Sequence, residues 1–163
     1  MPLWALFEIL TLGDFANLLS CLIINTRRNI TQDLGMNVAK VDTNYELVYR
    51  YLYALKDLRN AVAHNSVVFD TRFREFDPSK AMKKCLEQEF HLPYVNFKSI
   101  GDYVILICYY LKLLSVSKTE IKSFIREFEK ITNTYINAVD TNVSKAVIHP
   151  DLMSKINILK NFI

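Results

Sequence analysis

An arginine, an asparagine and a histidine lie close together in the chain, at Arg59, Asn60 and His64. Arginine carries a permanent planar charge that suits phosphate oxygens, and histidine gains or loses a proton near neutral pH. Together they can run RNA transesterification without a metal, since a base takes the ribose 2'-hydroxyl proton, the oxygen attacks phosphorus, and the cation stabilises the crowded transition state. DNA lacks this hydroxyl, so the predicted substrate is RNA.

The helix that should carry these residues does not align them. It is predicted to begin near Tyr45, after a cap at Asp42 or Thr43, and its apolar residues recur at three- and four-residue steps. On an ideal helix Arg59 and His64 point about 140° apart. Arg59 then falls within the apolar stripe, where an unpaired charge is costly. A cleft at a dimer interface, with two arginines and two histidines, satisfies this best.

A structural role for both residues stays open. In that reading Arg59 extends along the apolar surface and pairs with Asp57 or Glu46, while His64 caps the end of the helix. An Arg-x4-His spacing also arises by chance in roughly one such sequence in ten. Spacing alone therefore does not decide between catalysis and structure.

Composition predicts an all-α fold in one domain, residues 1–163. The chain has 51% hydrophobic residues, three glycines and four prolines, which favours long helices around a single core. Three widely spaced cysteines with apolar neighbours are interpreted as reduced core residues: Cys21, Cys85 and Cys108. The histidines are too scattered for a zinc site, so we expect no metal and no cofactor.

The first quarter of the chain is predicted to contain one bent helix and a linker. Two apolar segments, residues 4–10 and 15–24, are expected to form a core helix hinged at Gly13-Asp14. Residues 25–43 are polar and are predicted to be mostly a linker, with a short helical possibility that Gly35 would close.

The second half is predicted to be helical after an irregular stretch at residues 66–78. A short basic helix is expected at residues 79–90 and a strongly apolar one at residues 100–114. Ser117-Lys118-Thr119-Glu120 matches a capping box that opens the next helix. Pro150 is predicted to occupy the first turn of a short terminal helix.

We expect a cytoplasmic protein with no membrane segment. The apolar start has no basic leading stretch and carries Glu8 early, which argues against a secretory signal. The most lipid-like run, residues 104–111, is far shorter than the roughly 20 residues that span a bilayer. The net charge of +3 is mildly basic, and five cations could attract a polyanion or simply be solvated: Arg27, Arg28, Lys80, Lys83 and Lys84.

Two segments of the chain resemble a known family. One reads Leu58-Arg59-Asn60-Ala61-Val62-Ala63-His64-Asn65 and is similar to the LRNxxAHN/H signature of bacterial Abi-like abortive infection proteins, the AbiD and AbiF group. The other, at residues 2–13, is similar to the PxWxxxExLxxG segment that opens the same domain. A third and shorter stretch, Ile148-His149-Pro150, resembles the turn before the final helix of the family. From this resemblance we expect the chain to correspond to a short form that lacks the N-terminal region of a typical member.

The resemblance implies a HEPN domain, a helical bundle that is usually dimeric and acts as a metal-independent endoribonuclease in phage defence or toxin-antitoxin systems. Carried over by position, Arg59 and His64 are the catalytic pair and Asn60 is the polar neighbour that orients them. An RNA or protein antitoxin is an expected partner. Where many relatives carry another histidine and an Arg-aromatic pair, this chain has Asn65 and residues 66–69, so phosphate contacts are lost.

Two alternatives to a toxin nuclease stay open. The same helix end can bind RNA or a partner protein in a non-catalytic HEPN module, because fold alone does not define function. The short form can also be an antagonist or a remnant of a longer relative.

Overall fold

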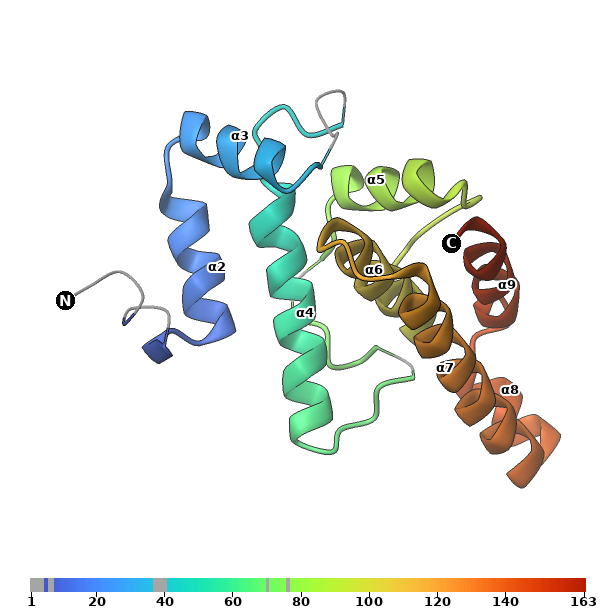
Figure 1. Ribbon diagram of the computed structural model, residues 1–163. Helices are drawn as coiled ribbons and strands as arrows, with labels where there is room; N and C mark the ends of the chain where they lie inside the picture. Colours follow the sequence, from blue (N-terminus) through green and yellow to red (C-terminus); the bar gives the residue numbers. More distant parts are fainter. Residues whose placement is uncertain (1–4, 6–7, 37–40, 70, 76) are drawn as a thin grey trace.

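The chain folds into packed helices, which confirms the predicted all-α class. The computed structural model describes residues 5, 8–36, 41–69, 71–75 and 77–163. Within these ranges there are eight helices and no strand (Figure 1). The helices are α2 (Leu12–Cys21), α3 (Ile24–Asp33), α4 (Leu47–Ala63), α5 (Lys80–Phe90), α6 (Ile100–Leu113), α7 (Lys118–Ala138), α8 (Thr141–Val147) and α9 (Leu152–Phe162).

Helix α2 begins with a capping box rather than with a hinge. The Thr11 hydroxyl accepts a hydrogen bond from the Asp14 N–H, and the Asp14 carboxylate accepts one from the Thr11 N–H. Gly13 therefore lies inside the first turn of α2, and the predicted hinge is wrong. Of the predicted segment 4–10, residues 4, 6 and 7 lie outside the described residues.

Helix α3 covers about half of the predicted linker, and it ends where the short helical possibility closed by Gly35 was expected. It carries few apolar residues, but Ile30 and Leu34 pack against the core and Thr31 is buried. The Thr31 hydroxyl donates to the Arg27 carbonyl 2.8 Å away, which satisfies it inside the helix. Tertiary packing thus overrides a sequence with no clear helical period. Residues 37–40 of the predicted linker lie outside the described part of the chain.

Helix α4 carries the candidate site and lies between α2 and α6. It begins at Leu47, two residues later than predicted, because Tyr45 adopts a positive φ of 53°. The predicted N-cap at Asp42 or Thr43 is wrong, because the N-cap residue is Glu46, which makes no side-chain cap bond. Asp42 still supports the helix start, since its buried carboxylate accepts the Leu47 N–H at 2.8 Å. Figure 1 shows α2 running alongside α4, with α5 to α9 on its other side.

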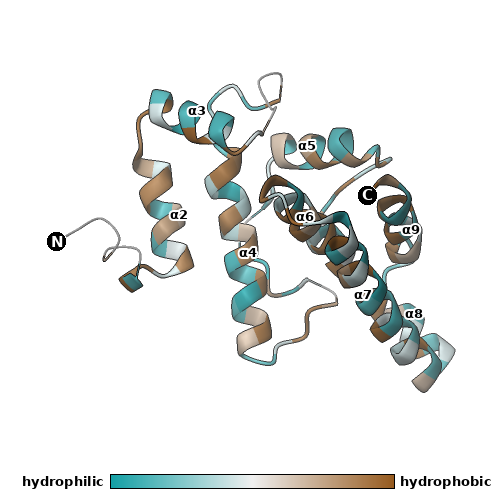
Figure 2. Ribbon diagram, viewed as in Figure 1, coloured by the Kyte–Doolittle hydropathy of each residue, from teal (hydrophilic) through white to brown (hydrophobic). Residues whose placement is uncertain are grey.

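The core is built around α6, which is buried over most of its length. The predicted boundaries hold closely for α5, capped by the Ser79 hydroxyl, and for α7, which opens with the Ser117–Glu120 capping box. Helix α8 was not predicted, and Pro150 lies just before α9 rather than in its first turn. In Figure 2, where the ribbon is coloured by residue hydropathy, hydrophobic residues recur along the helices that meet at this core.

The cysteine prediction is right for two residues and wrong for one. Cys85 and Cys108 are buried free thiols, whereas Cys21 is exposed at the last position of α2. Burial raises the pKa of the Cys108 thiol to about 12, so this thiol stays protonated and unreactive. None of the described helices has the length and apolar character needed to cross a membrane.

Candidate functional site

The three predicted site residues lie at the C-terminal end of α4. Arg59 is exposed, Asn60 is half-buried, and His64 is the exposed C-cap residue. The His64 N–H donates to the Asn60 carbonyl 3.0 Å away, so these two residues stack one turn apart. Within the described part of the chain, no hydrogen bond joins the Arg59 side chain to either of them. One chain therefore presents the guanidinium and the imidazole without linking them.

A backbone motif ends the helix directly after His64. The Asn65 N–H donates to the Val62 carbonyl at 3.2 Å, and the Ser66 N–H donates to the Ala61 carbonyl at 2.8 Å. This pair of bonds is a Schellman motif, and its left-handed residue is Asn65 at φ 51°. The motif fixes the direction in which the chain leaves His64. Asn65 therefore has a role in the backbone conformation, which its place in the family-like segment at residues 58–65 did not reveal.

Arg59 borders an apolar hollow rather than a carboxylate. The hollow has a volume of about 450 Å³ and is lined by Arg59 and six apolar residues from α2, α4 and α6: Leu12, Leu55, Leu58, Val62, Ala63 and Ile107. The structural alternative paired Arg59 with Asp57 or Glu46. That alternative is wrong, because Asp57 contacts Lys56 and Glu46 contacts Arg50. The other half of it is right, since His64 does stand at the helix C-cap.

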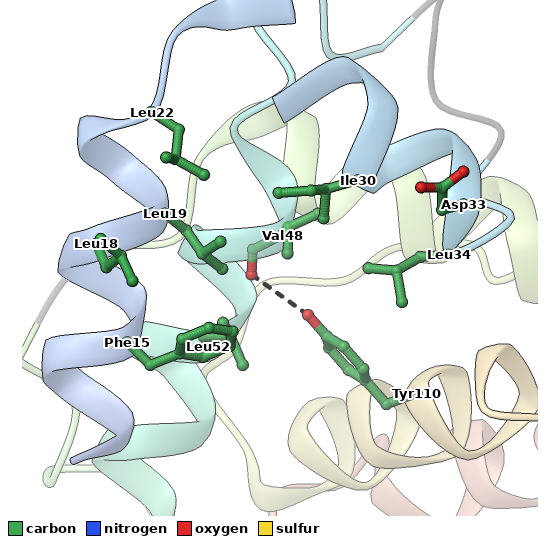
Figure 3. A pocket seen from close by; sticks show the side chains of 10 residues that line it. All are labelled: Phe15, Leu18, Leu19, Leu22, Ile30, Asp33, Leu34, Val48, Leu52 and Tyr110. Atoms are coloured by element: carbon green, nitrogen blue, oxygen red, sulfur yellow. Dashed lines mark hydrogen bonds between the residues drawn. The ribbon is translucent and has the colours of Figure 1, made fainter. Parts of the chain in front are cut away.

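A larger apolar pocket continues this hollow along α4. It holds about 670 Å³ between α2, α3, α4 and α6 (Figure 3), and Asp33 is its one charged lining residue. The Tyr110 hydroxyl crosses it to donate to the Val48 carbonyl at 3.3 Å. Leu52 lines the pocket and Leu55 lines the hollow, so the two are successive along α4. We call them together the apolar trough.

Asp57 anchors the chain that follows the site. Its side chain is 1% exposed, and its carboxylate accepts the Glu75 N–H at 3.0 Å and lies 3.1 Å from the Lys56 ammonium. Lys56 also contacts the Glu75 carboxylate at 2.6 Å. These contacts hold the loop after His64 against the last two turns of α4. The hydrogen bond to Glu75 raises the pKa of Lys56, which keeps the ammonium charged.

Gly13 allows α2 to approach this anchor. A methyl group at its Cα would lie 3.3 Å from the Lys56 Cδ, closer than ordinary van der Waals contact. Gly13, the last residue of the family-like segment at residues 2–13, therefore leaves room for the Lys56 side chain that reaches Asp57. No group of three or more histidine, cysteine or acidic side chains suited to a metal occurs in the described part of the chain.

Sequence reasoning missed the anchor, although the chain carries a signal for it. Asp57 falls on the buried row of α4 with Ala54 and Ala61, three and four residues away. A carboxylate between two small buried residues must meet a donor from elsewhere in the fold. Its donor, Glu75, is 18 residues further on in an irregular loop, so the pattern gave no partner.

The segment that contains the candidate site is similar to a known protein family. No curated protein and no solved structure is significantly similar to the chain. A family model described as Abi-like protein matches residues 1–70, a segment that contains α2, α3 and the whole of α4. This matched segment includes both regions that resemble the family and all three predicted site residues. Residues 1–70 are therefore similar to the Abi-like proteins.

Proposed function

We propose that the chain is a metal-independent HEPN-type endoribonuclease that acts as an abortive-infection or toxin-antitoxin toxin. The Abi-like match supports a function of the abortive-infection type. The observation that carries the nuclease proposal is the end of α4, where Arg59 and His64 are exposed and form no ion pair or hydrogen bond through their side chains with described residues. A guanidinium and an imidazole that the fold does not use are free to act on a ligand.

The proposed reaction is attack by a ribose 2'-hydroxyl on the adjacent phosphorus. One His64 imidazole accepts the hydroxyl proton as the 2'-oxygen–phosphorus bond forms. Arg59 donates to the non-bridging oxygens and stabilises the added negative charge. The phosphorus–5'-oxygen bond then breaks, and a protonated imidazole supplies a proton to the leaving oxygen. The products are a 2',3'-cyclic phosphate and a free 5'-hydroxyl.

A homodimer would supply both the acid and the base. Each chain offers one His64, and Arg59 borders the apolar trough, whose exposed residues include Val62 at 60% exposure and Leu18 at 38%. Packing two troughs together would bury this apolar surface and bring the two ends of α4 toward each other. Asn60, half-buried beneath His64, would orient the imidazole.

The direct test is cleavage of a labelled single-stranded RNA by the purified protein in the presence of EDTA. Arg59→Ala and His64→Ala should each reduce the rate by roughly 10²–10⁴-fold. Matched controls are Arg28→Ala and His91→Asn, which change an exposed arginine and an exposed histidine on other helices or their ends. The proposal is contradicted if the wild-type protein leaves the RNA intact. It is also contradicted if wild type cleaves the RNA no faster than Arg59→Ala and His64→Ala do.

Mixing the two inactive variants tests the shared site. A dimer of one Arg59→Ala chain and one His64→Ala chain keeps one guanidinium and one imidazole in a composite site, so the mixture should recover part of the wild-type rate. Two independent sites would each still lack a residue, and the mixture would stay inactive. Val62→Glu should lower both the dimer fraction and the cleavage rate, because it places a charge in the trough.

A further inference from the structure

One face of α7 carries cations at regular spacing. Lysine or arginine recurs every fourth residue and every one is exposed; we call this set the basic ridge: Lys118, Lys122, Arg126 and Lys130. None of its members forms an ion pair with a described residue. A four-residue step advances about 6 Å along a helix, so the ridge runs about 18 Å. That length matches several successive phosphates of a polynucleotide strand.

The cations of the ridge outnumber the carboxylates exposed beside it. Exposed hydroxyl side chains, such as Thr119 and Ser123, lie between its members. Of the carboxylates on α7, Glu120 accepts from Ser117 in the capping box, and Glu129 contacts Lys160 at 2.8 Å. Glu127 is exposed and forms no ion pair in the described part of the chain. The positive charge of the ridge is therefore not neutralised by its own protein.

This arrangement disfavours the helix that carries it. Like charges four residues apart destabilise a helix, whereas opposite charges at the same spacing stabilise it. The chain uses the favourable pairing on α4, where Arg50 contacts Glu46 at 2.6 Å. On α7 the same spacing repeats one sign of charge, and a bound polyanion is what would relieve the repulsion.

An anionic membrane is a poor partner for this face. A helix that lies on a bilayer inserts an apolar face between the lipids. The apolar face of α7 is already used, since Ile121 and Ile125 are buried against the rest of the bundle and Phe128 packs on the core. Figure 2 shows the visible outer side of α7 as mostly hydrophilic. What the ridge offers is charge alone, which suits a phosphate backbone.

The helix that carries the ridge also contacts the loop after the candidate site. Tyr135 of α7 stacks on Phe69, with ring centroids 5.6 Å apart, and Phe69 follows His64 by five residues. Lys130 precedes Tyr135 by five residues, about 7.5 Å along the helix axis and about 140° around it, so a strand that follows the ridge would have to cross α7 to reach this loop. We propose that the basic ridge holds the phosphate backbone of the RNA strand that reaches the end of α4. The identity of this polyanion as RNA rests on the proposed function.

Binding to a non-cleavable strand tests the ridge apart from catalysis. The probe is a fluorescein-labelled 2'-O-methyl single-stranded RNA, which lacks the attacking hydroxyl, and the readout is anisotropy over a range of salt concentrations. Changing three ridge residues to glutamine, Lys122, Arg126 and Lys130, should weaken binding at least tenfold at low salt. It should also reduce the salt slope by about 2, since each single-strand phosphate contact contributes about 0.7.

A triple variant with equal charge loss is the control. Glutamine at three exposed lysines outside α7, Lys98, Lys112 and Lys145, should leave both affinity and salt slope near wild type. Equal weakening by the two triples, or wild-type binding by the ridge triple, overturns the proposal. So does wild-type binding to vesicles containing phosphatidylserine in the absence of binding to the RNA. Circular dichroism confirms that each triple retains its helices.

The outcomes separate this proposal from the proposed nuclease. Arg59→Ala and His64→Ala should bind the 2'-O-methyl strand as wild type does. Ridge-dependent binding by a protein that cleaves no RNA would reject the nuclease and keep the ridge. If cleavage requires Arg59 and His64 but the ridge triple binds the RNA as wild type does, the nuclease proposal is kept and the ridge proposal is rejected.

Discussion

Two regions of this molecule use charged residues in opposite ways. Where α9 meets α6, the Lys155 ammonium lies 2.7 Å from the Asp102 carboxylate and 2.9 Å from that of Asp151, with 2% of its side chain exposed. The Tyr94 hydroxyl donates to Asp151 at 2.6 Å. At the end of α4, Arg59 and His64 are exposed and form no ion pair with a described residue.

The difference separates charges that hold the fold from charges that the fold leaves available. Burial lowers the pKa of Lys155, but the Asp102 and Asp151 carboxylates raise it more, so the ammonium stays charged inside the protein. Asp102 also accepts the N–H groups of Asn96 and Phe97, which fixes the turn before α6. Among the residues that the structure describes, the α4 end has no such network of side chains, and its geometry comes from backbone bonds and from the buried Asp57 carboxylate.

Breaking the buried network should give the largest loss of stability. Lys155→Met leaves the fully buried Asp102 carboxylate without a cation, and we expect the free energy of unfolding to fall by about 3–5 kcal/mol. Urea denaturation followed by circular dichroism measures this. Lys160→Met removes a half-exposed cation from Glu129 of α7 and should cost at most about 1 kcal/mol.

The same measurement on Arg59→Met sharpens the contrast. We expect a change within about 0.5 kcal/mol, because no contact within the described chain depends on the guanidinium charge. A loss at Arg59 that equals the loss at Lys155 would show that the two regions are not distinct, and would favour a structural role for Arg59.

Changing Asp57, which anchors the loop after His64, should destabilise the protein less than Lys155→Met does. Asp57→Asn keeps an oxygen that can accept the Glu75 N–H but removes the charge opposite Lys56. The free energy of unfolding should fall by about 1–2 kcal/mol. RNA cleavage should weaken as well, because the loop after His64 loses part of its hold.

Glu75→Gln is the control for this anchor. It removes an exposed partner of the same lysine and leaves the buried carboxylate in place, so it should cost less than Asp57→Asn in denaturation. Equal losses for the two variants would mean that the buried carboxylate adds nothing beyond a surface ion pair.

Local signals in the sequence predicted those parts of the fold that local interactions determine. The Ser117–Glu120 capping box, the apolar stripe of α4 and the apolar α6 all depend on neighbours within a few residues. Of helix α3 only the end was predicted, as a short helical possibility closed by Gly35, because the stability of the rest comes from packing of Ile30 and Leu34 on the core, which no period along the chain records.

In the candidate site, too, the features set by neighbouring residues were predicted and those set by distant residues were not. The motif located Arg59, Asn60 and His64 at one helix end, and the structure places them there. Their buried support was not predictable, because Asp57 meets Glu75 across 18 residues. The buried network where α9 meets α6 was not predictable either, because Asp102 meets Lys155 across 53 residues. Such partners are set by the packing of distant elements, so a single sequence shows the carboxylate without its donor.

The last predicted effect concerns the backbone at the exposed end of α4. If the Schellman motif orders this end, the left-handed Asn65 should accept glycine but not alanine, so Asn65→Ala should lower the free energy of unfolding by about 1 kcal/mol relative to Asn65→Gly. Asn29, exposed within α3, should show the opposite order, because alanine favours a helix interior by about 1 kcal/mol over glycine. Denaturation of the four variants gives both differences. The same order at both asparagines would mean that the left-handed turn does not hold the end of α4, and the contrast would then rest on Asp57 alone.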